Sequence, residues 1–135
     1  MPILSHAVEA DRELFERELD GFVPDIVCDA HMHVWAKDHL PPDGYEAFRE
    51  LEEDAVDLAA YRRRMAALLP GRRVEGGLAL PGAVGATGPQ IKAQNEFTAA
   101  EVRAGPGWRG AMLVTPGMDP EYIRAEVRRL GLSGL

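Results

Sequence analysis

Two histidines with one residue between them lie shortly after a short apolar run. His31 and His33 come after Ile26-Val27-Cys28, and Asp29 precedes the first histidine by two residues. Pro24 and the β-branched residues after it favour a buried strand. Side chains alternate along a strand, so Asp29, His31 and His33 are predicted to share one face, with neighbours about 6.6 Å apart. Because neutral imidazole is a good ligand for zinc and similar ions, this spacing predicts a divalent metal site.

A His-x-His pair alone is also common among ordinary surface histidines, so its surroundings decide. Three titratable groups on one face of an apolar strand are costly to bury unpaired, and a bound cation removes that cost. Asp29 lies too far along the strand to share the ion easily. It is predicted at most to orient the two ligands without binding the ion itself. Trp35 follows the pair, either lining a pocket or packing in the core. Cys28 is predicted to be a small apolar residue of the buried strand.

Residues 26–35, IVCDAHMHVW, resemble the first-strand signature of the amidohydrolase superfamily, hydrophobic-Asp-x-His-x-His. The resemblance is to the amidohydrolase-related (amidohydrolase 2) branch, which includes metal-dependent decarboxylases and lactone hydrolases. It implies a TIM barrel in which His31 and His33 bind zinc or another divalent metal. It also implies a hydrolase or decarboxylase of a small molecule that carries an amide, ester, lactone or carboxylate group.

The family's remaining ligands and acid–base residues lie on later strands and match nothing in this chain. The catalytic residues therefore stay unassigned, and residues 1–135 alone are expected to be inactive. His39 is the nearest further histidine, and we expect it in an exposed loop.

Composition narrows the choice of partner and compartment. The chain has 135 residues, enough for one domain with a core, and a net charge of -7. That charge argues against nucleic acid and does not favour an anionic membrane. One cysteine, no apolar leader and no apolar run of membrane-spanning length favour a cytoplasmic protein. We expect a small-molecule substrate, and a homo-oligomer for the full-length form.

Hydrophobic periodicity and breakers alternate strands with helices. The first helix is predicted to start at a Ser5 cap and stop at Gly21, with an apolar stripe of Val8, Phe15, Leu19 and Phe22. The second segment, 45–69, is predicted to be helical, as one helix or two. The other predicted elements are strands at 24–35, 74–80 and 108–115, helices at 90–103 and from an Asp119 cap to Gly131, and the start of a fourth strand at 132.

This order predicts an α/β fold with parallel neighbouring strands. With the resemblance, it becomes the N-terminal portion of a (β/α)8 TIM barrel, about three βα units plus the start of a fourth strand. Residues 1–23 form an N-terminal helical arm and residues 24–135 the partial barrel domain, expected to be truncated. Two alternatives stay open: a non-enzymatic α/β module whose glycine-rich loop 82–88 binds a nucleotide, and a fragment that associates with a partner.

Overall fold

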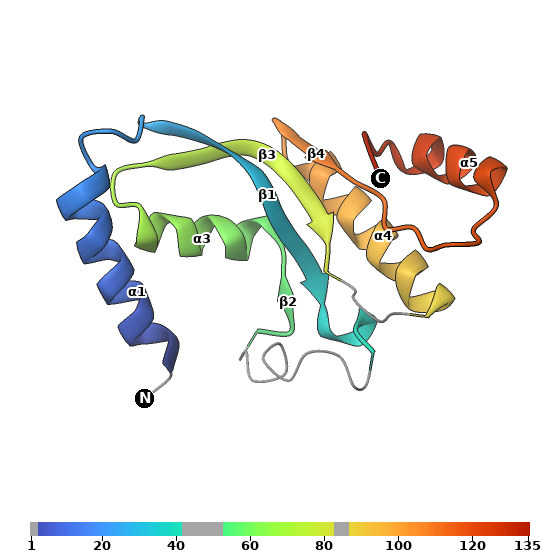
Figure 1. Ribbon diagram of the computed structural model, residues 1–135, viewed down its shortest axis with the longest axis horizontal. Coiled ribbons are helices and arrows are strands. Elements are labelled where there is room, and N and C mark those ends of the chain that lie inside the picture. The colour runs from blue at the N-terminus through green and yellow to red at the C-terminus, as the bar shows by residue number, and fades with distance from the viewer. Residues whose placement is uncertain (1–2, 42–52, 83–86) are drawn as a thin grey trace.

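The computed structural model describes residues 3–41, 53–82 and 87–135, with side chains from Val8 onward (Figure 1). It is an α/β structure in which helices pack on a mixed sheet. Its elements are α1 (Ile3–Leu14), the π-helical turn η1 (Phe15–Leu19), β1 (Ile26–Ala36), the 3₁₀ turn η2 (Lys37–His39), β2 (Ala55–Val56), α3 (Leu58–Leu68), β3 (Arg73–Pro81), α4 (Gly88–Ala104), β4 (Trp108–Gly110) and α5 (Pro120–Leu130).

The sheet has the strand order β2-β1-β3-β4. β1 pairs with β3 and β3 pairs with β4, both in parallel, which confirms the predicted order of these three strands. β4 is shorter than the predicted strand at 108–115. A single parallel bridge between Ala111 and Gly134 then brings the predicted fourth strand beside it.

β2 was not predicted, because residues 55–57 were expected to belong to a helix. Trp35 instead pairs with Val56 in an antiparallel ladder, and Val56 is buried. Asp57 then caps α3, since its carboxylate accepts a hydrogen bond from the Ala60 amide. Because of the pairing with β1 and this cap, the helix begins only at Leu58. The rest of the predicted segment, 45–52, lies outside the described residues.

The ends of the later helices follow the sequence signals. α4 begins at Gly88, two residues before the predicted start, behind a capping box between Thr87 and Gln90. α5 begins at Asp119, whose side chain accepts from the Glu121 amide, and ends at Gly131 with a φ of 69°. Ser5, by contrast, does not cap the first helix, because α1 already begins at Ile3.

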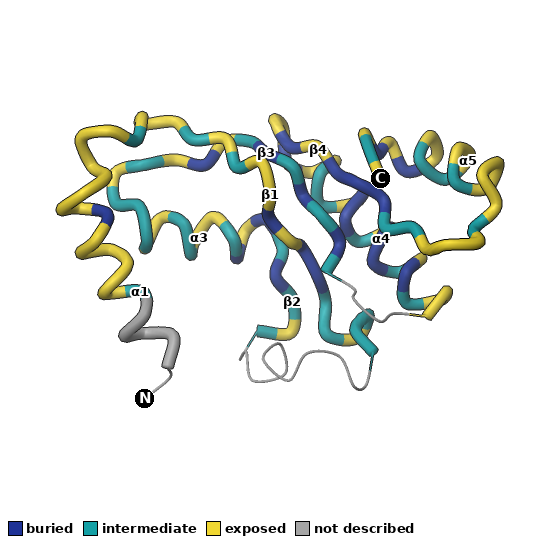
Figure 2. The backbone as a smooth tube through the Cα atoms, in the orientation of Figure 1, coloured by how far each residue is buried: buried dark blue, intermediate teal, exposed yellow. Residues whose placement is uncertain are grey.

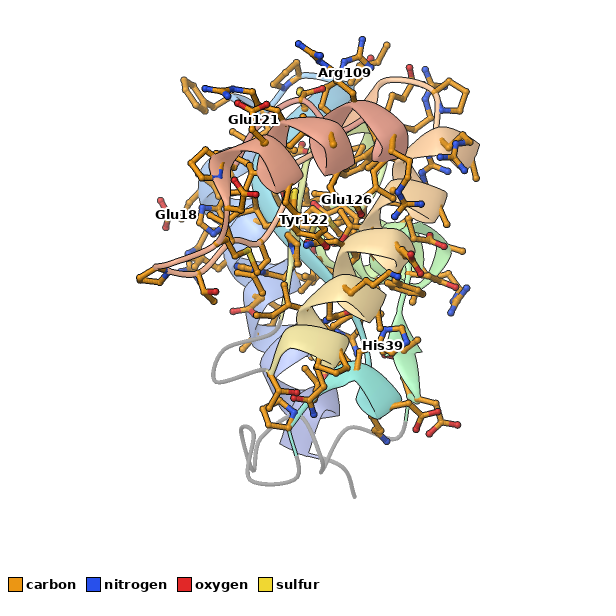
Figure 3. The ribbon with its side chains drawn as sticks, turned by 90° about the vertical axis from the view of Figure 1, so that its right-hand side faces the viewer. Glu18, His39, Arg109, Glu121, Tyr122 and Glu126 are labelled. Carbon is orange, nitrogen blue, oxygen red and sulfur yellow. The ribbon has the colours of Figure 1, made fainter. Side chains whose placement is uncertain are left out.

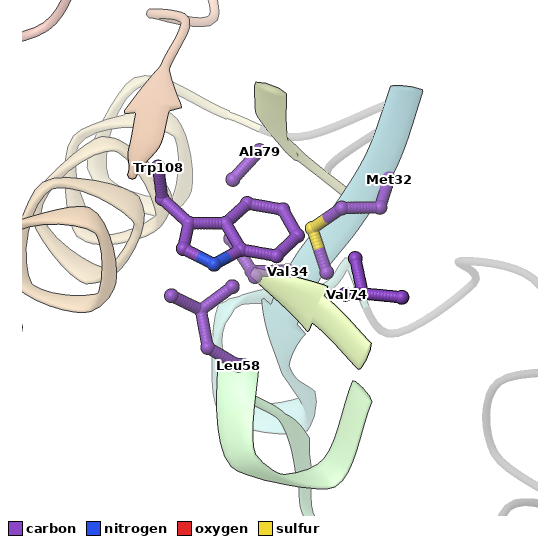
Figure 4. Packing of buried hydrophobic residues seen from close by; sticks show 6 residues of the cluster. All are labelled: Met32, Val34, Leu58, Val74, Ala79 and Trp108. Atoms are coloured by element: carbon purple, nitrogen blue, oxygen red, sulfur yellow. The ribbon is translucent and has the colours of Figure 1, made fainter. Parts of the chain in front are cut away.

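The core lies between one face of the sheet and the helices α3 and α4 (Figure 4). Its centre is the buried indole of Trp108, which the Tyr61 ring meets edge-to-face at 5.6 Å. The buried members of this cluster are Met32, Val34, Leu58, Val74, Ala79 and Trp108.

The opposite face of β1 carries no covering helix within the described residues, and burial alternates along the strand except at residues 30–31 and 34–35 (Figure 2). Ile26, Cys28, His31 and His33 are exposed there. The expectation that Cys28 belongs to the core is therefore wrong, because only one face of β1 is covered.

The N-terminal arm is attached to the body through Arg72. Its guanidinium lies over the Phe15 ring at 5.3 Å, donates to the Val23 carbonyl and forms an ion pair with Asp20. Phe15 is buried, but Leu19 and Phe22 are exposed, so the predicted stripe is wrong beyond Phe15. The π-helical turn explains this, because its extra residue rotates the following side chains off the stripe.

No helix in the described part of the chain combines the length and apolarity needed to cross a bilayer.

Candidate metal centre

A β-bulge in β1 sets the direction of each polar side chain at the site. Asp29 pairs with Gly77 and Met32 pairs with Ala79, so β1 uses three steps where β3 uses two. The extra residue reverses the alternation between Asp29 and Met32. Gly77 allows the close approach, because a Cβ there would lie 2.1 Å from the Asp29 carbonyl oxygen.

The bulge separates Asp29 from the histidines. The Asp29 carboxylate accepts a hydrogen bond from the Tyr61 hydroxyl of α3, on the helix-covered face that also holds Met32. His31 and His33 lie on the open face. The prediction that all three side chains share one face is therefore wrong for Asp29, since strict alternation does not hold across a bulge.

The two histidines do share a face, as predicted, and their Nε2 atoms are 3.2 Å apart. Their ring centroids are 5.1 Å apart, with the planes at 63°. Two nitrogens bound to one tetrahedral zinc ion, each at about 2.0–2.1 Å, lie about 3.3 Å from each other. The pair therefore has the separation of two ligands of a single ion.

The tautomer of His33 is set by the end of the neighbouring strand. Its Nδ1 lies 3.2 Å from the Pro81 carbonyl oxygen, which can only accept, so Nδ1 carries the proton. The Nε2 of His33 then carries a lone pair that points toward the His31 Nε2, and this lone pair can accept a hydrogen bond from His31 or bind a cation. A backbone carbonyl behind a metal-binding imidazole is a common arrangement, and here β3 supplies it.

Asp29 holds the main chain at the bulge. One carboxylate oxygen accepts from the His31 amide at 2.9 Å, and the other accepts from Tyr61. Burial, followed by the hydrogen bond and the negative charge of Asp29, raises the pKa of Tyr61 well above its usual value. The phenol therefore stays a donor, and the carboxylate fixes the backbone that carries His31.

His39 and Trp35 are occupied elsewhere. His39 Nδ1 lies 3.3 Å from Gln94 Oε1, and its ring meets Phe97 edge-to-face. Trp35 is buried and packs against Gly82 at the end of β3. A Cβ added to Gly82 would lie 3.2 Å from the Cβ of Trp35. Within the described ranges, no third His, Cys, Asp or Glu joins the histidine pair to form a cluster of three.

The burial of polar residues on α4 was not predicted from the sequence. Asn95 donates to the Leu113 carbonyl and accepts from the Leu113 amide, so its side chain satisfies both main-chain groups of a residue just after β4. Gln94 and Thr98 are fully buried, and Gln94 holds His39. Their signal was three polar residues at positions 94, 95 and 98, on the face of the helix that meets the sheet.

The predicted nucleotide loop falls mostly on residues 83–86, which lie outside the described residues. No family model, curated protein or solved structure matches the chain.

Proposed function

We propose that His31 and His33 bind a divalent metal ion, zinc in the first place, at the ends of parallel strands. In the complete protein this site serves a metal-dependent hydrolase or decarboxylase of a small molecule with an amide, ester, lactone or carboxylate group. The observation that carries the proposal is the 3.2 Å separation of the two Nε2 atoms. The same two residues carry the resemblance to the amidohydrolase superfamily.

The parallel order β1-β3-β4 supports the second part of this proposal, that the domain is the N-terminal portion of a (β/α)8 barrel. In such barrels the active site lies at the C-terminal ends of the strands. His33 pairs with Leu80, one residue before the last pair of the ladder between β1 and β3. This position of His33, near the C-terminal end of β3, supports the proposal of a barrel active site.

The chain's own residues present and orient the two imidazoles. The Pro81 carbonyl keeps the His33 proton on Nδ1, and Asp29 with Tyr61 fixes the backbone of His31. A metal ion bound there would lower the pKa of its water and polarise a carbonyl or carboxylate of the substrate. The open face of β1 supplies one wall for such a substrate.

Two protein ligands are fewer than the three that catalytic zinc generally has. We therefore expect residues 1–135 to bind zinc reversibly and to show no turnover, with further ligands supplied from beyond the described residues or by a partner. This expectation separates metal binding by the pair from catalysis by the complete site.

Zinc titration of the chain against a chromophoric chelator tests the pair directly. We expect one zinc per chain, and a loss of affinity of at least tenfold in both His31→Ala and His33→Ala. His39→Ala is the matched control, because its imidazole bonds to Gln94, and its affinity should stay within twofold of the parent. Cobalt in place of zinc should give visible absorption that the two ligand variants lack.

Absence of stoichiometric binding, or an equal loss in His39→Ala, would remove the metal site and with it the proposed activity. Circular dichroism of each variant shows whether the fold survives the substitution. Because His31 and His33 are exposed, we expect their replacement to leave the unfolding midpoint within a few degrees of the parent.

A further inference from the structure

A cavity of about 430 Å³ is lined by residues of α4, β4 and α5 and by residues just after α5. Figure 3 shows Arg109, which lines this cavity, near the top of the molecule and His39, next to the end of β1, in its lower half. Among the residues that the structure describes, four arginines line the cavity and no acidic residue does. They come from three elements: Arg103 from α4, Arg109 from β4, and Arg128 and Arg129 from α5.

This concentration is unexpected for the composition of the chain. The sequence has 15 Lys and Arg against 22 Asp and Glu, for a net charge of -7. Four of the 15 cationic residues nevertheless surround one cavity. Like charges that gather around one cavity repel each other, and an anion placed among them relieves that repulsion.

Three of the four guanidinium groups keep donors available. In the described part of the chain Arg103 and Arg128 form no ion pair or hydrogen bond through their side chains, and Arg109 bonds only to the Trp108 carbonyl. Arg129 differs, because its Nε and Nη2 both donate to the Glu126 carboxylate, and Nη2 also donates to Glu96. This bidentate bond lowers the pKa of Glu126 and holds Arg129 in place.

Helix dipoles explain part of this arrangement. Arg103, Arg128 and Arg129 lie in the last turns of α4 and α5, where a positive side chain is favourable. That account does not cover Arg109, which comes from a strand. Nor does it cover the convergence of both helix ends on one cavity. Each helix end contributes about half a negative charge, which is less than the three unpaired guanidinium groups supply.

We infer that this cavity binds a phosphorylated small molecule. Guanidinium forks match phosphate oxygens two at a time, and a cavity of this size lies within the range of small-molecule sites. The hydroxyl-bearing Ser133 adds a further donor at the wall, and the apolar residues Val102, Trp108 and Leu130 add a surface for the non-phosphate part. This site does not depend on the proposed metal centre.

Calorimetric titration of the full chain with inorganic pyrophosphate tests the inference. Metal-free buffer and the His31→Ala variant exclude binding through a metal ion at the histidines. We expect one saturable site, about tenfold weaker binding on going from 50 to 200 mM salt, and little binding of citrate at equal concentration. Binding that is lost in His31→Ala, or that is equal for citrate, would overturn the inference.

The decisive variant is Arg103→Gln with Arg128→Gln, because neither side chain has a partner to lose in the described structure. We expect it to weaken pyrophosphate binding at least tenfold. The matched control is Arg17→Gln with Arg63→Gln, which makes the same change of charge on η1 and α3 and should change binding less than twofold. Equal weakening in both double variants would show a general effect of charge and no site.

Should the first double variant unfold, Arg109→Gln alone serves as the second test. It removes one exposed guanidinium from β4 and is expected to weaken binding about threefold to tenfold, with unchanged circular dichroism. Unchanged binding in this variant would also count against the site.

Discussion

The two faces of β1 differ in burial and in the kind of side chain that they carry. The covered face presents Asp29, Met32 and Val34 to α3 and α4, and Met32 and Val34 are buried. The open face presents Cys28, His31 and His33, all exposed. The two side chains that could bind a metal therefore lie on the face that contributes least to the core, whereas their supporting carboxylate lies on the other.

The bulge at residues 30–31 places Asp29 on one face of β1 and the two histidines on the other. In a regular strand Asp29 would stand beside the histidines and would need solvent or a cation as its partner. The extra residue turns it toward Tyr61 instead, and its second oxygen still reaches the His31 amide. Stability and ligand geometry are thus coupled through the backbone of a single residue.

Trp108→Ala should produce the largest effect, because it removes the centre of the covered face. The indole is 2% exposed and contacts helix and strand residues of the core. We expect a loss of about 3–5 kcal/mol in the free energy of unfolding, measured by urea denaturation. Ile26→Ala, on the open face and 52% exposed, is the control and should cost less than about 1 kcal/mol. Similar losses in both variants would mean that the open face is covered in solution.

Much of the fold can be read from the sequence where local signals decide it. The start of α5 at Asp119-Pro120 and its end at Gly131 follow from capping and from the left-handed glycine. The parallel order of the three main strands follows from their alternation with helices. These features depend on a few neighbouring residues, so a single sequence is enough.

Other features depend on distant partners and were missed for that reason. β2 forms because Val56 finds Trp35, and nothing within residues 45–57 signals a strand there. The direction of Asp29 depends on Gly77, whose lack of a side chain lets the two backbones approach. The histidine pair was recognisable from its spacing, whereas the arginines of the cavity are scattered over 27 positions and meet only in the fold.

Tyr61→Phe should weaken the link between the two faces with a smaller effect. The change keeps the ring against Trp108 and removes one donor from the half-buried Asp29. We expect a loss of about 1–2 kcal/mol in the free energy of unfolding. Because the backbone of His31 is then less firmly held, zinc affinity should also fall, by roughly tenfold. Unchanged zinc affinity together with the loss of stability would confine Asp29 and Tyr61 to the covered face.

The ionisation of Tyr61 at alkaline pH should have the smallest effect on the free energy of unfolding, and it tests the Asp29–Tyr61 hydrogen bond most specifically. Burial and Asp29 raise the pKa of Tyr61 in the folded state, so the unfolded chain releases this proton first, near the ordinary phenol value of about 10. The contribution is fully present below that pH and is lost as the pH rises further. Tyrosinate absorbance should show that the difference between the parent and Tyr61→Phe is nearly zero at pH 10.5, while both are folded. In urea the same difference should show a titrating phenol, since unfolding separates it from Asp29. A phenol that ionises near pH 10 in the folded parent would mean that the Asp29–Tyr61 bond is absent, and the orientation of Asp29 toward the covered face would lose its main support.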